Sequence, residues 1–390
     1  MKKSMLRILH IARRELRRMV SNPMYVLCMV LFPLAVTFFF TSLMDEGQPE
    51  SMPVGIVDQD NTSFTRKLTR SLDAFQTSRV VAHYASLEEA RQAMQHGDIY
   101  AFLYFPKGTT DALLSSRQPV ISFYYTYTSL TAGALLYRDL KTISTLGSAA
   151  VGSATLTAKG LTPKQISTFL QPVKVDLHTV ANPWINYNVY LSTMLIPGCL
   201  LLFVFLITAY AFGQELKMGT ARELLAEAGG SSFVAVIGKL LPHFVINLAL
   251  FYFYLFYVFA AMHFPHGGGV GEILLLGFLS VTASMGFGVF MFGLLPSLRM
   301  SMSMCSLWGV LSFSMVGTAF PTFAMDAPLE VLSALFPLRH YFRLYQTCVF
   351  NSNPLVYDWP NIVALIAFML LPLLVMRNIK RAYKNYVYIS

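Results

Sequence analysis

The sequence predicts a polytopic α-helical membrane protein with six transmembrane helices and an extracytoplasmic α/β domain inserted between helices 1 and 2. The first observation is composition: 55% of the 390 residues are hydrophobic and 13% are charged, whereas soluble domains carry about 25% charged residues. The second is a set of six long apolar runs. The third is the stretch 45–189, which separates the first two runs and alternates strand-like with helix-like patterns.

The six apolar runs define the predicted spans. They lie at about 24–44, 190–212, 241–262, 270–295, 302–322 and 361–376. Because about 20 helical residues cross the hydrocarbon core, the last run is slightly short, but Trp359 and Arg377 flank it as interfacial anchors. The first run follows seven Lys and Arg residues and lacks a small-residue cleavage site. We therefore expect a retained signal anchor.

The distribution of Lys and Arg orients these spans. The formal net charge is +9, and its positive charge is concentrated in residues 1–22 and 377–390. With both termini in the cytoplasm, the inner segments hold fifteen Lys and Arg, and the short outer segments hold only Arg339 and Arg343. We therefore expect a multi-pass membrane protein with both termini in the cytoplasm. Basic residues beside spans do not indicate a nucleic-acid partner.

Residues 45–189 are expected to form one small α/β domain outside the membrane. Four strands are predicted at 54–57, 79–84, 99–105 and 120–127, and four helices at 63–75, 87–96, 109–116 and 130–158. Ser86 is suited to cap the second of these helices and Gly97 to end it. Strand and helix in repetition are typical of an α/β fold with one modest core.

Three further segments are predicted to lie at the membrane surfaces. Residues 1–22 form a cytoplasmic amphipathic interfacial helix, whose apolar stripe comprises Met5, Ile8, Leu9, Ala12, Leu16 and Met19. Residues 323–360 form short outer-leaflet helices, in which Leu329, Leu332, Leu335 and Phe336 share a face. Residues 377–390 form a basic cytoplasmic tail.

A short charged helix is predicted at 220–229, between spans two and three. Thr220 and Glu223 fit a capping box, and Gly229 with Gly230 fits a left-handed stop. The apolar stripe of this helix comprises Leu224, Leu225 and Ala228, with Arg222, Glu223 and Glu227 around it. So short a helix is marginal alone in water, so either the inner lipid surface or a soluble partner should hold it. Its acids favour a partner, because anionic lipid repels them.

Four stretches, taken in order, carry a family resemblance. They are VGIVDQDNTSFTRKL, the run from Asn182-Pro183 through Tyr187 to Pro197-Gly198, KMGTARELLAEAGGSS and LFPLRHYFRLY. With six spans and a large outer domain, the chain resembles an ABC-2 type transporter permease, the membrane subunit of a type-2 ATP-binding-cassette exporter. The resemblance covers nearly the whole chain. It departs from the family at Ala226-Glu-Ala-Gly, where members more often carry a small residue and proline, which concerns the docking surface and not the class.

The resemblance implies that the helix at 220–229 is a coupling helix that sits in a cleft of a separate cassette ATPase. The implied coupling residues are Thr220, Arg222, Glu223, Leu224, Leu225, Glu227 and Ala228. It also implies export of a drug-like, lipid or envelope-related compound. The working unit would be a dimer of permeases, identical or different, with two ATPase chains. A periplasmic adaptor protein is a further candidate partner.

The chain itself is not expected to be an enzyme. The GxxxxG run from Gly147 to Gly152 is followed by Ser, lacks the phosphate-binding Lys and lies in a predicted outer-domain helix. ATP and Mg²⁺ are therefore expected on a separate ATPase subunit, and no cofactor or metal on this chain. His263 and His266 share a short loop that has no third ligand.

Residues inside the predicted spans bear on the alternatives. His243 is the main ionisable residue near a span interior, and without an acid or base beside it a proton-driven antiporter is disfavoured. Ser280, Ser284 and Gly288 recur at a spacing of four, which indicates close helix packing rather than a hydroxyl-lined path. Two other functions remain open. One is a membrane-anchored sensor; the other is an ATPase-independent scaffold whose outer domain binds a ligand or partner.

Overall fold

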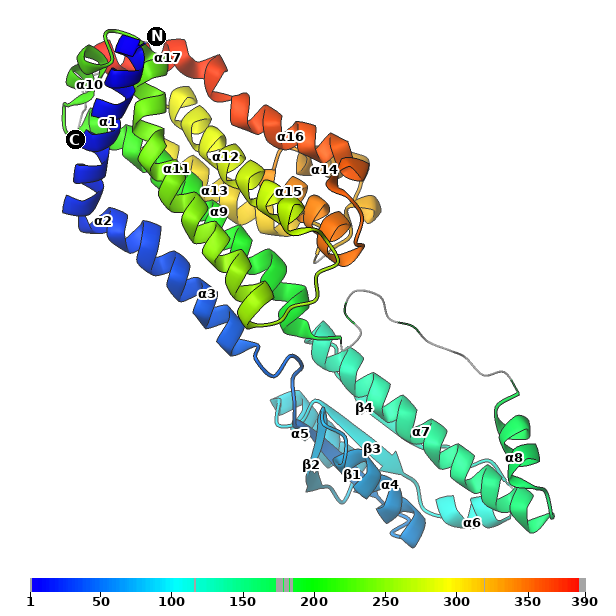
Figure 1. The fold of residues 1–390 in the computed structure, drawn as a ribbon. Helices are drawn as coiled ribbons and strands as arrows, with labels where there is room; N and C mark the ends of the chain where they lie inside the picture. Colours follow the sequence, from blue (N-terminus) through cyan, green and yellow to red (C-terminus); the bar gives the residue numbers. More distant parts are fainter. Residues whose placement is uncertain are drawn as a thin grey trace. The chain divides into compact units, whose positions relative to one another are not determined.

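The computed structural model describes residues 2–115, 117–172, 178, 182, 185–318 and 320–385. The chain divides into two compact units (Figure 1): a helical unit, Met1–Asp45 with Thr179–Ser390, and an α/β unit, Glu46–His178. The α/β unit therefore interrupts the helical unit in sequence. Pro183 of the Asn182-Pro183 pair lies outside the described residues.

A four-stranded mixed sheet organises the α/β unit. Its strands are β1 (Met52–Asp58), β2 (Ser78–His83), β3 (Ala101–Phe105) and β4 (Ser122–Tyr125). They lie in the order β2-β1-β3-β4. β1 is parallel to both β2 and β3, whereas β4 is antiparallel to β3. Parallel neighbours cannot be joined by a tight turn, so helices must connect them.

Helices cover both faces of this sheet. The covering helices are α4 (Ser63–Asp73), α5 (Leu87–His96) and α7 (Leu130–Ala158). The unit also contains α6 (Thr109–Leu114) and α8 (Pro163–Leu170), of which α8 packs against α7. α4 and α7 contribute Leu72 and Leu136 to one core, together with Ile56 of β1. α5 contributes Ala90 to a second core, together with Phe102 of β3. The alternation of side chains along each strand thus supplies two separate cores.

Local signals predicted the bounds of α5 and α7 correctly. Ser86 Oγ accepts a hydrogen bond from the Glu89 amide at 3.2 Å. Gly97 ends α5 in the left-handed conformation, with a φ of 87°. Ser129 caps α7 by accepting from the Ala132 amide. The four strands differ from the predicted bounds by at most two residues at either end.

The helical unit starts with α1 (Lys2–Ser21). One apolar helix follows, made of α2 (Pro23–Val26), a π-helical turn (Leu27–Leu31) and α3 (Phe32–Leu43). The remaining helices are α9 (Tyr187–Lys217), α10 (Ala221–Glu227), α11 (Ser232–Phe256), α12 (Val270–Leu294), α13 (Leu298–Met315), α14 (Ala327–Ser333), α15 (Pro337–Tyr345), α16 (Trp359–Leu370) and α17 (Pro372–Asn385).

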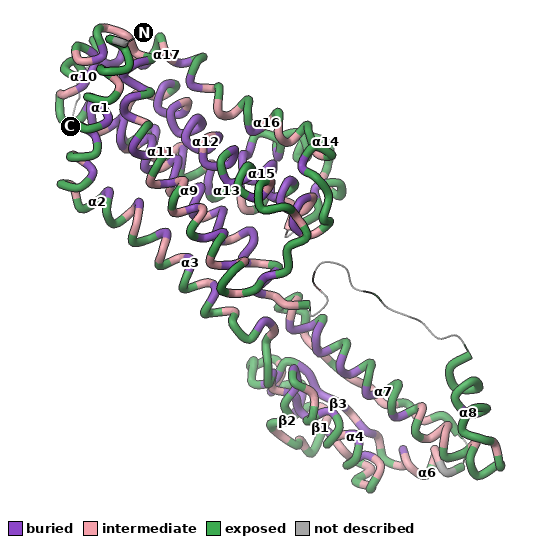
Figure 2. The backbone as a smooth tube through the Cα atoms, in the orientation of Figure 1, coloured by how far each residue is buried: buried purple, intermediate pink, exposed green. Residues whose placement is uncertain are grey.

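Five helices in the described part of the chain are long and apolar enough to cross a membrane. They are Pro23–Leu43, Tyr187–Lys217, Ser232–Ala261, Val270–Leu294 and Leu355–Asn385. α9 and α12 form the centre of the unit (Figure 2). In their most apolar stretches 67% and 72% of the residues are buried, against 28% or less in the other three helices. The helical unit therefore has a protein-packed central pair, and its outer helices can face lipid.

Several of the predicted spans have different bounds in the structure. The runs 190–212 and 241–262 are parts of longer helices, Tyr187–Lys217 and Ser232–Ala261. The run 302–322 corresponds to α13, Leu298–Met315, an 18-residue helix that is not among the five apolar ones. The run 361–376 is part of a longer helix, Leu355–Asn385. Residues 377–385 therefore continue α17 instead of starting a separate tail, because no helix-breaking residue follows Pro372. Residues 386–390 lie outside the described residues.

The segment 323–360 also differs from its prediction. α15 was expected at the outer lipid surface, but Leu338, Tyr341 and Phe342 are each at most 4% exposed. They belong to the large core that includes residues of α9, α11 and α12. α14 keeps apolar side chains exposed, with Val331 at 71%. α14 therefore retains the character of a surface helix, whereas α15 does not.

The small residues on α12 mark a close contact with α9, as their spacing predicted. A Cβ atom added at Gly288 would lie 2.8 Å from the carbonyl oxygen of Phe205 and 3.0 Å from Cβ of Thr208. Ser280 and Ser284 on the same helix are buried. Glycine at this position therefore lets the two backbones approach.

We expect Gly288→Ala to destabilise the helical unit, and Gly271→Ala on the same helix to have little effect. A Cβ at Gly271 meets no atom within 4 Å. Overpacking a tight contact costs about 1–3 kcal/mol, whereas Ala in open space is favoured over Gly by up to ~1 kcal/mol. Thermal unfolding of the purified full chain should show a lower midpoint for Gly288→Ala alone. Equal midpoints would argue against a close contact between α9 and α12.

Candidate functional site

The helix predicted at 220–229 is α10, and it contacts α1, α11 and α17 (Figure 1). Its residues Leu224, Leu225 and Ala228 are at most 5% exposed. They share a core with Ile11 of α1 and Ile379 of α17. The structure therefore corrects the expectation that this stripe faces a partner protein, because the chain's own helices already cover it.

The other face of α10 is open. Arg222, Glu223 and Ala226 are exposed, and Glu227 is half-buried. Arg222 Nε donates a hydrogen bond to the backbone carbonyl of Lys384 at 3.1 Å. Of the predicted coupling residues, the structure thus presents Arg222 and Glu223 outward and turns the apolar ones inward.

The two ends of α10 behave differently. The predicted capping box is wrong, because the Thr220 hydroxyl donates to the Glu215 carboxylate and does not cap the helix. Thr220 also accepts from Arg18 Nη2 at 3.2 Å. The predicted glycine stop is confirmed: Gly229 and Gly230 have φ angles of 66° and 77°. α10 is therefore tied at its start to α9 and α1.

A buried ion cluster joins α1, α9, α10 and α11. Its members are Arg14, Glu15, Arg18, Glu215, Glu227, Lys239 and His243. Lys239, whose side chain is fully buried, donates from Nζ to Glu15 at 2.5 Å and to Glu215 at 2.9 Å. His243 Nε2 lies 3.0 Å from the second oxygen of Glu15. Lys239 thus bridges carboxylates from two other helices.

Two arginines of α1 extend the ion cluster to α10. Arg14 donates to Glu215 and to Glu227, at 3.1 Å in each case. Arg18 pairs with Glu215. Three carboxylates therefore meet two guanidinium groups and one ammonium group, which satisfies the requirement that buried charges be paired and hydrogen-bonded.

Glu15 is ionised at neutral pH. Burial alone would raise the pKa of its carboxyl group, but the charge of Lys239 and hydrogen bonds from His243 and Lys239 outweigh burial and lower the pKa to about 2. The expectation that His243 has no acid or base beside it is therefore wrong. Glu15 reaches it from α1, which was predicted to lie on the lipid surface. The surroundings of His243 therefore no longer argue against proton-driven transport.

Apolar contact also holds α1 to the unit. A Cβ at Gly238 of α11 would lie 2.9 Å from Cβ of Ile11, so this glycine lets α1 approach closely. Ile11 and Met19 are almost fully buried. The exposed apolar residues of α1 are Met5, Leu6, Leu9, Leu16 and Val20. The predicted stripe is therefore divided, with part on protein and part free to meet lipid.

Two signals in the sequence point toward the ion cluster. Glu15 is the one acid among many bases in residues 1–22, and Lys239 is a single base within an apolar stretch. A lone charge on an otherwise opposite or apolar background predicts a buried partner. Periodicity alone cannot say which helices meet, so the pairing was missed.

A family model described as ABC-2 family transporter protein matches residues 24–376. The chain belongs to the ABC-2 transporter family. The match runs from the first apolar helix through the α/β unit to α17, and it confirms the resemblance seen in the sequence. No curated protein matches the chain.

Membership in the ABC-2 family makes the chain the membrane component of an ABC transporter, a class that associates with an ATPase partner. The components of this family are generally non-catalytic. Gly147 and Gly152, the glycines of the GxxxxG run, lie inside α7, where they face the side chains of Leu68 and Leu170. Their small size therefore serves helix packing in this ABC-2 permease.

We expect Lys239→Met to loosen α1. Removing one partner of a buried ion pair costs about 3–5 kcal/mol, and here two carboxylates would lose a counter-charge. Limited trypsin digestion of the full chain should then cut α1 faster, and the thermal midpoint should fall. Lys217→Met, at an exposed position on α9, is the matched control and should change neither. Unchanged protection of α1 in Lys239→Met would contradict a holding role for the ion cluster.

Proposed function

We propose that the chain is the permease subunit of an ATP-driven exporter in the bacterial cytoplasmic (inner) membrane, and that a separate ATPase acts on it through α10. In this proposal α13 joins the five apolar helices as a sixth span. Both termini lie in the cytoplasm, and the α/β unit lies outside. ATP and Mg²⁺ bind to the ATPase, and this chain needs no cofactor.

The observation that carries the proposal is the two-sided character of α10. Its inner side is covered by the chain's own helices, and its outer side offers Arg222 and Glu223. A helix that is fixed on one side and polar on the other suits a transient contact with a soluble protein, since such interfaces are about as polar as ordinary surface.

The ion cluster supplies a route by which motion of α10 reaches the spans. Closure of the ATPases on ATP presses α10. The Arg14–Glu227 ion pair and the Thr220–Glu215 hydrogen bond pass this displacement to α1 and α9. α9 and α12 pack closely at Gly288, so they move together. Two permease subunits rock in this way and open a path outward.

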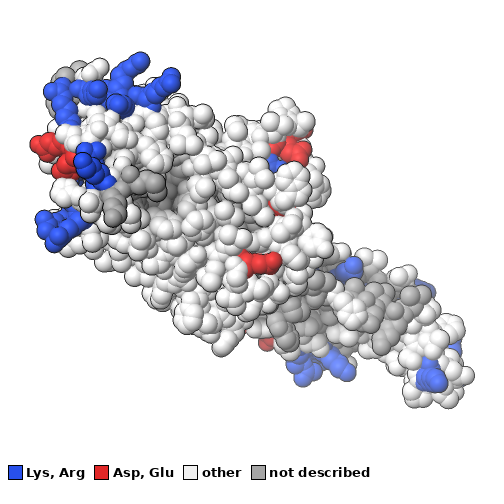
Figure 3. All heavy atoms as spheres, turned by 45° about the horizontal axis from the view of Figure 1, so that its top comes forward, with Lys and Arg blue, Asp and Glu red and all other residues white. Residues whose placement is uncertain are grey.

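Charge distribution supports the proposed orientation. Lys and Arg gather at the end of the helical unit formed by α1, α10 and α17, and the view in Figure 3 shows much of the adjoining surface without charge. Basic residues beside spans favour the cytoplasmic side. The same end carries α10, where an ATPase would bind.

The proposal extends to the assembly and the cargo. A second permease, identical or similar, completes the translocation path, and two ATPase chains bind on the cytoplasmic side. The cargo is a drug-like, lipid or envelope-related compound, which a periplasmic adaptor would receive. Affinity purification of the full chain from its native host, followed by mass spectrometry, identifies the ATPase and any adaptor.

We expect Glu223→Arg and Ala226→Arg to lower recovery of the ATPase by about tenfold, because they alter only the exposed face of α10. Glu88→Arg is the matched control, since Glu88 is likewise an exposed acid in the first turn of a helix. It should leave recovery unchanged. Leu224→Glu is unsuitable, because Leu224 is buried within the chain and the substitution would disturb folding.

The measurement is the amount of ATPase that co-purifies at matched abundance of the permease in membranes. Undiminished recovery with both Glu223→Arg and Ala226→Arg would rule out the outer face of α10 as the docking surface. ATP hydrolysis by the purified permease alone would contradict the assignment of the activity to a separate subunit.

We expect single cysteines at Asp73 and Lys384 to report opposite sides of the membrane. Both positions are exposed in the structure. In a background without Cys28, Cys199, Cys305 and Cys348, an impermeant maleimide should label Asp73→Cys in spheroplasts and label Lys384→Cys only after the membrane is broken. The reverse pattern would overturn the orientation.

A further inference from the structure

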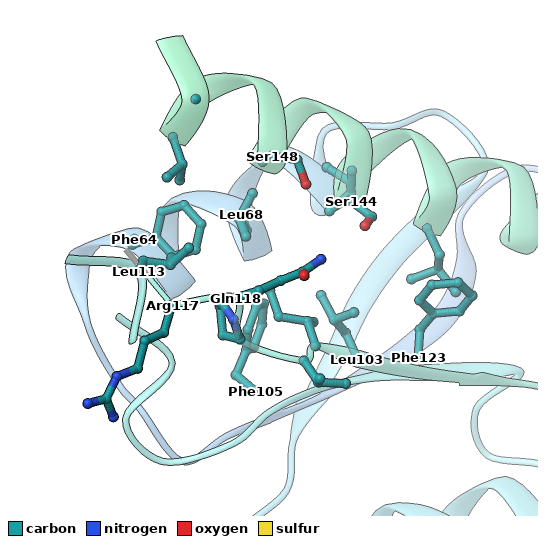
Figure 4. A pocket seen from close by; sticks show the side chains of 18 of the residues that line it. Phe64, Leu68, Leu103, Phe105, Leu113, Arg117, Gln118, Phe123, Ser144 and Ser148 are labelled. Carbon is teal, nitrogen blue, oxygen red and sulfur yellow. The ribbon is translucent and has the colours of Figure 1, made fainter. Parts of the chain in front are cut away.

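A groove of about 920 Å³ lies within the α/β unit, between α7 and the sheet (Figure 4). This volume falls within the ~300–1,000 Å³ typical of sites for small ligands. Its walls include Phe64 and Leu68 of α4, Leu103 and Phe105 of β3, and Ile143 of α7. The proposed export function does not use this groove.

The groove leaves apolar surface open that the core does not cover. Phe64 and Phe123 are only half-buried, and Val120 on the rim is 72% exposed. Apolar surface gathered in a concave site indicates binding more strongly than scattered exposed residues do. The ligand should therefore be largely apolar.

The groove is long. Its lining on α7 extends from Leu140 to Leu156, and at 1.5 Å per residue this helical stretch is about 24 Å long. Ser144 and Ser148 are small, exposed residues along that side of the groove. A long groove with small residues along one wall suits an extended chain better than a compact ring system.

Polar groups lie at one edge. Figure 4 shows Gln118 reaching into the space between α7 and the sheet, and Arg117 at the edge with its guanidinium group pointing outward. The Arg117 backbone N–H donates to the Ala112 carbonyl at 2.8 Å, which fixes the start of this segment. Among the described residues of the lining, Arg117 is the only charged one. This edge of the groove therefore favours a ligand that carries an anionic group.

We propose that the groove binds a single acyl chain with an anionic head group. The chain lies along α7 and the sheet, and the head group remains in water beside Arg117. The absence of acids from the described lining argues against a cationic amphiphile. The proposal concerns binding alone, so it does not depend on the direction of transport or on the ATPase.

The experiment uses the full chain in amphipol, with palmitate that carries a diazirine in its tail as the probe. After irradiation, mass spectrometry should locate cross-links within residues 103–156. Arg117→Gln should lower labelling of these peptides about fivefold, because an exposed charge pair contributes up to ~1 kcal/mol. The methyl ester of the probe has no anionic head group, so it should label more weakly and should not respond to Arg117→Gln.

Ser148→Trp and Ser144→Trp fill the groove from exposed positions on α7, so each should abolish labelling in this region. Thr145→Trp is the matched control, since Thr145 is exposed on α7 outside the lining, and it should leave labelling intact. Thermal midpoints of all variants check folding. Labelling confined to the helical unit, or undiminished in both filled variants, would overturn the site. Equal response of acid and ester to Arg117→Gln would overturn the anionic head group.

Discussion

Everything at the charged end of the helical unit depends on the bridge that Lys239 forms between Glu15 and Glu215. A buried ammonium group without counter-charges would be strongly unfavourable. Its two carboxylates come from α1 and α9, so the charge of α11 is neutralised only when all three helices are in place. The apolar contact of Ile11 with Gly238 brings the helices together, and the bridge selects one register, because ion pairs are directional where apolar contact is not.

The ion cluster holds α10 in position in the ABC-2 permease. A helix of seven residues has little stability of its own, and the burial of Leu224 and Leu225 supplies what it lacks. The same burial means that any partner meets only the outer, mostly polar side. The apolar contacts that stabilise this short helix thus lie on one face, and its exposed polar side chains lie on the other. The close contact of α9 with α12 at Gly288 then links this end to the centre of the unit.

The sequence correctly predicted the helix bounds that local interactions determine. α5 and α7 were predicted to the residue, because caps such as Ser86 and stops such as Gly97 act within a few positions. The ion cluster was missed, since Glu15 and Lys239 lie 224 residues apart along the chain and no local pattern pairs them. The stripe at Leu224 was correctly read as a buried face, but a stripe does not say what buries it. For the same reason α15 was mistaken for a surface helix.

The two sets of charges at this end should respond differently to ionic strength. The bridge at Lys239 is sealed from water, so dissolved ions barely screen it, whereas the outward charges of Arg222 and Glu223 act across solvent and weaken as salt rises. A concentrated salt wash of isolated membranes would therefore strip a partner that is bound through α10 and leave α1 in place. The permease would then be free of its partner but still folded, and the partner would bind again once the salt is diluted.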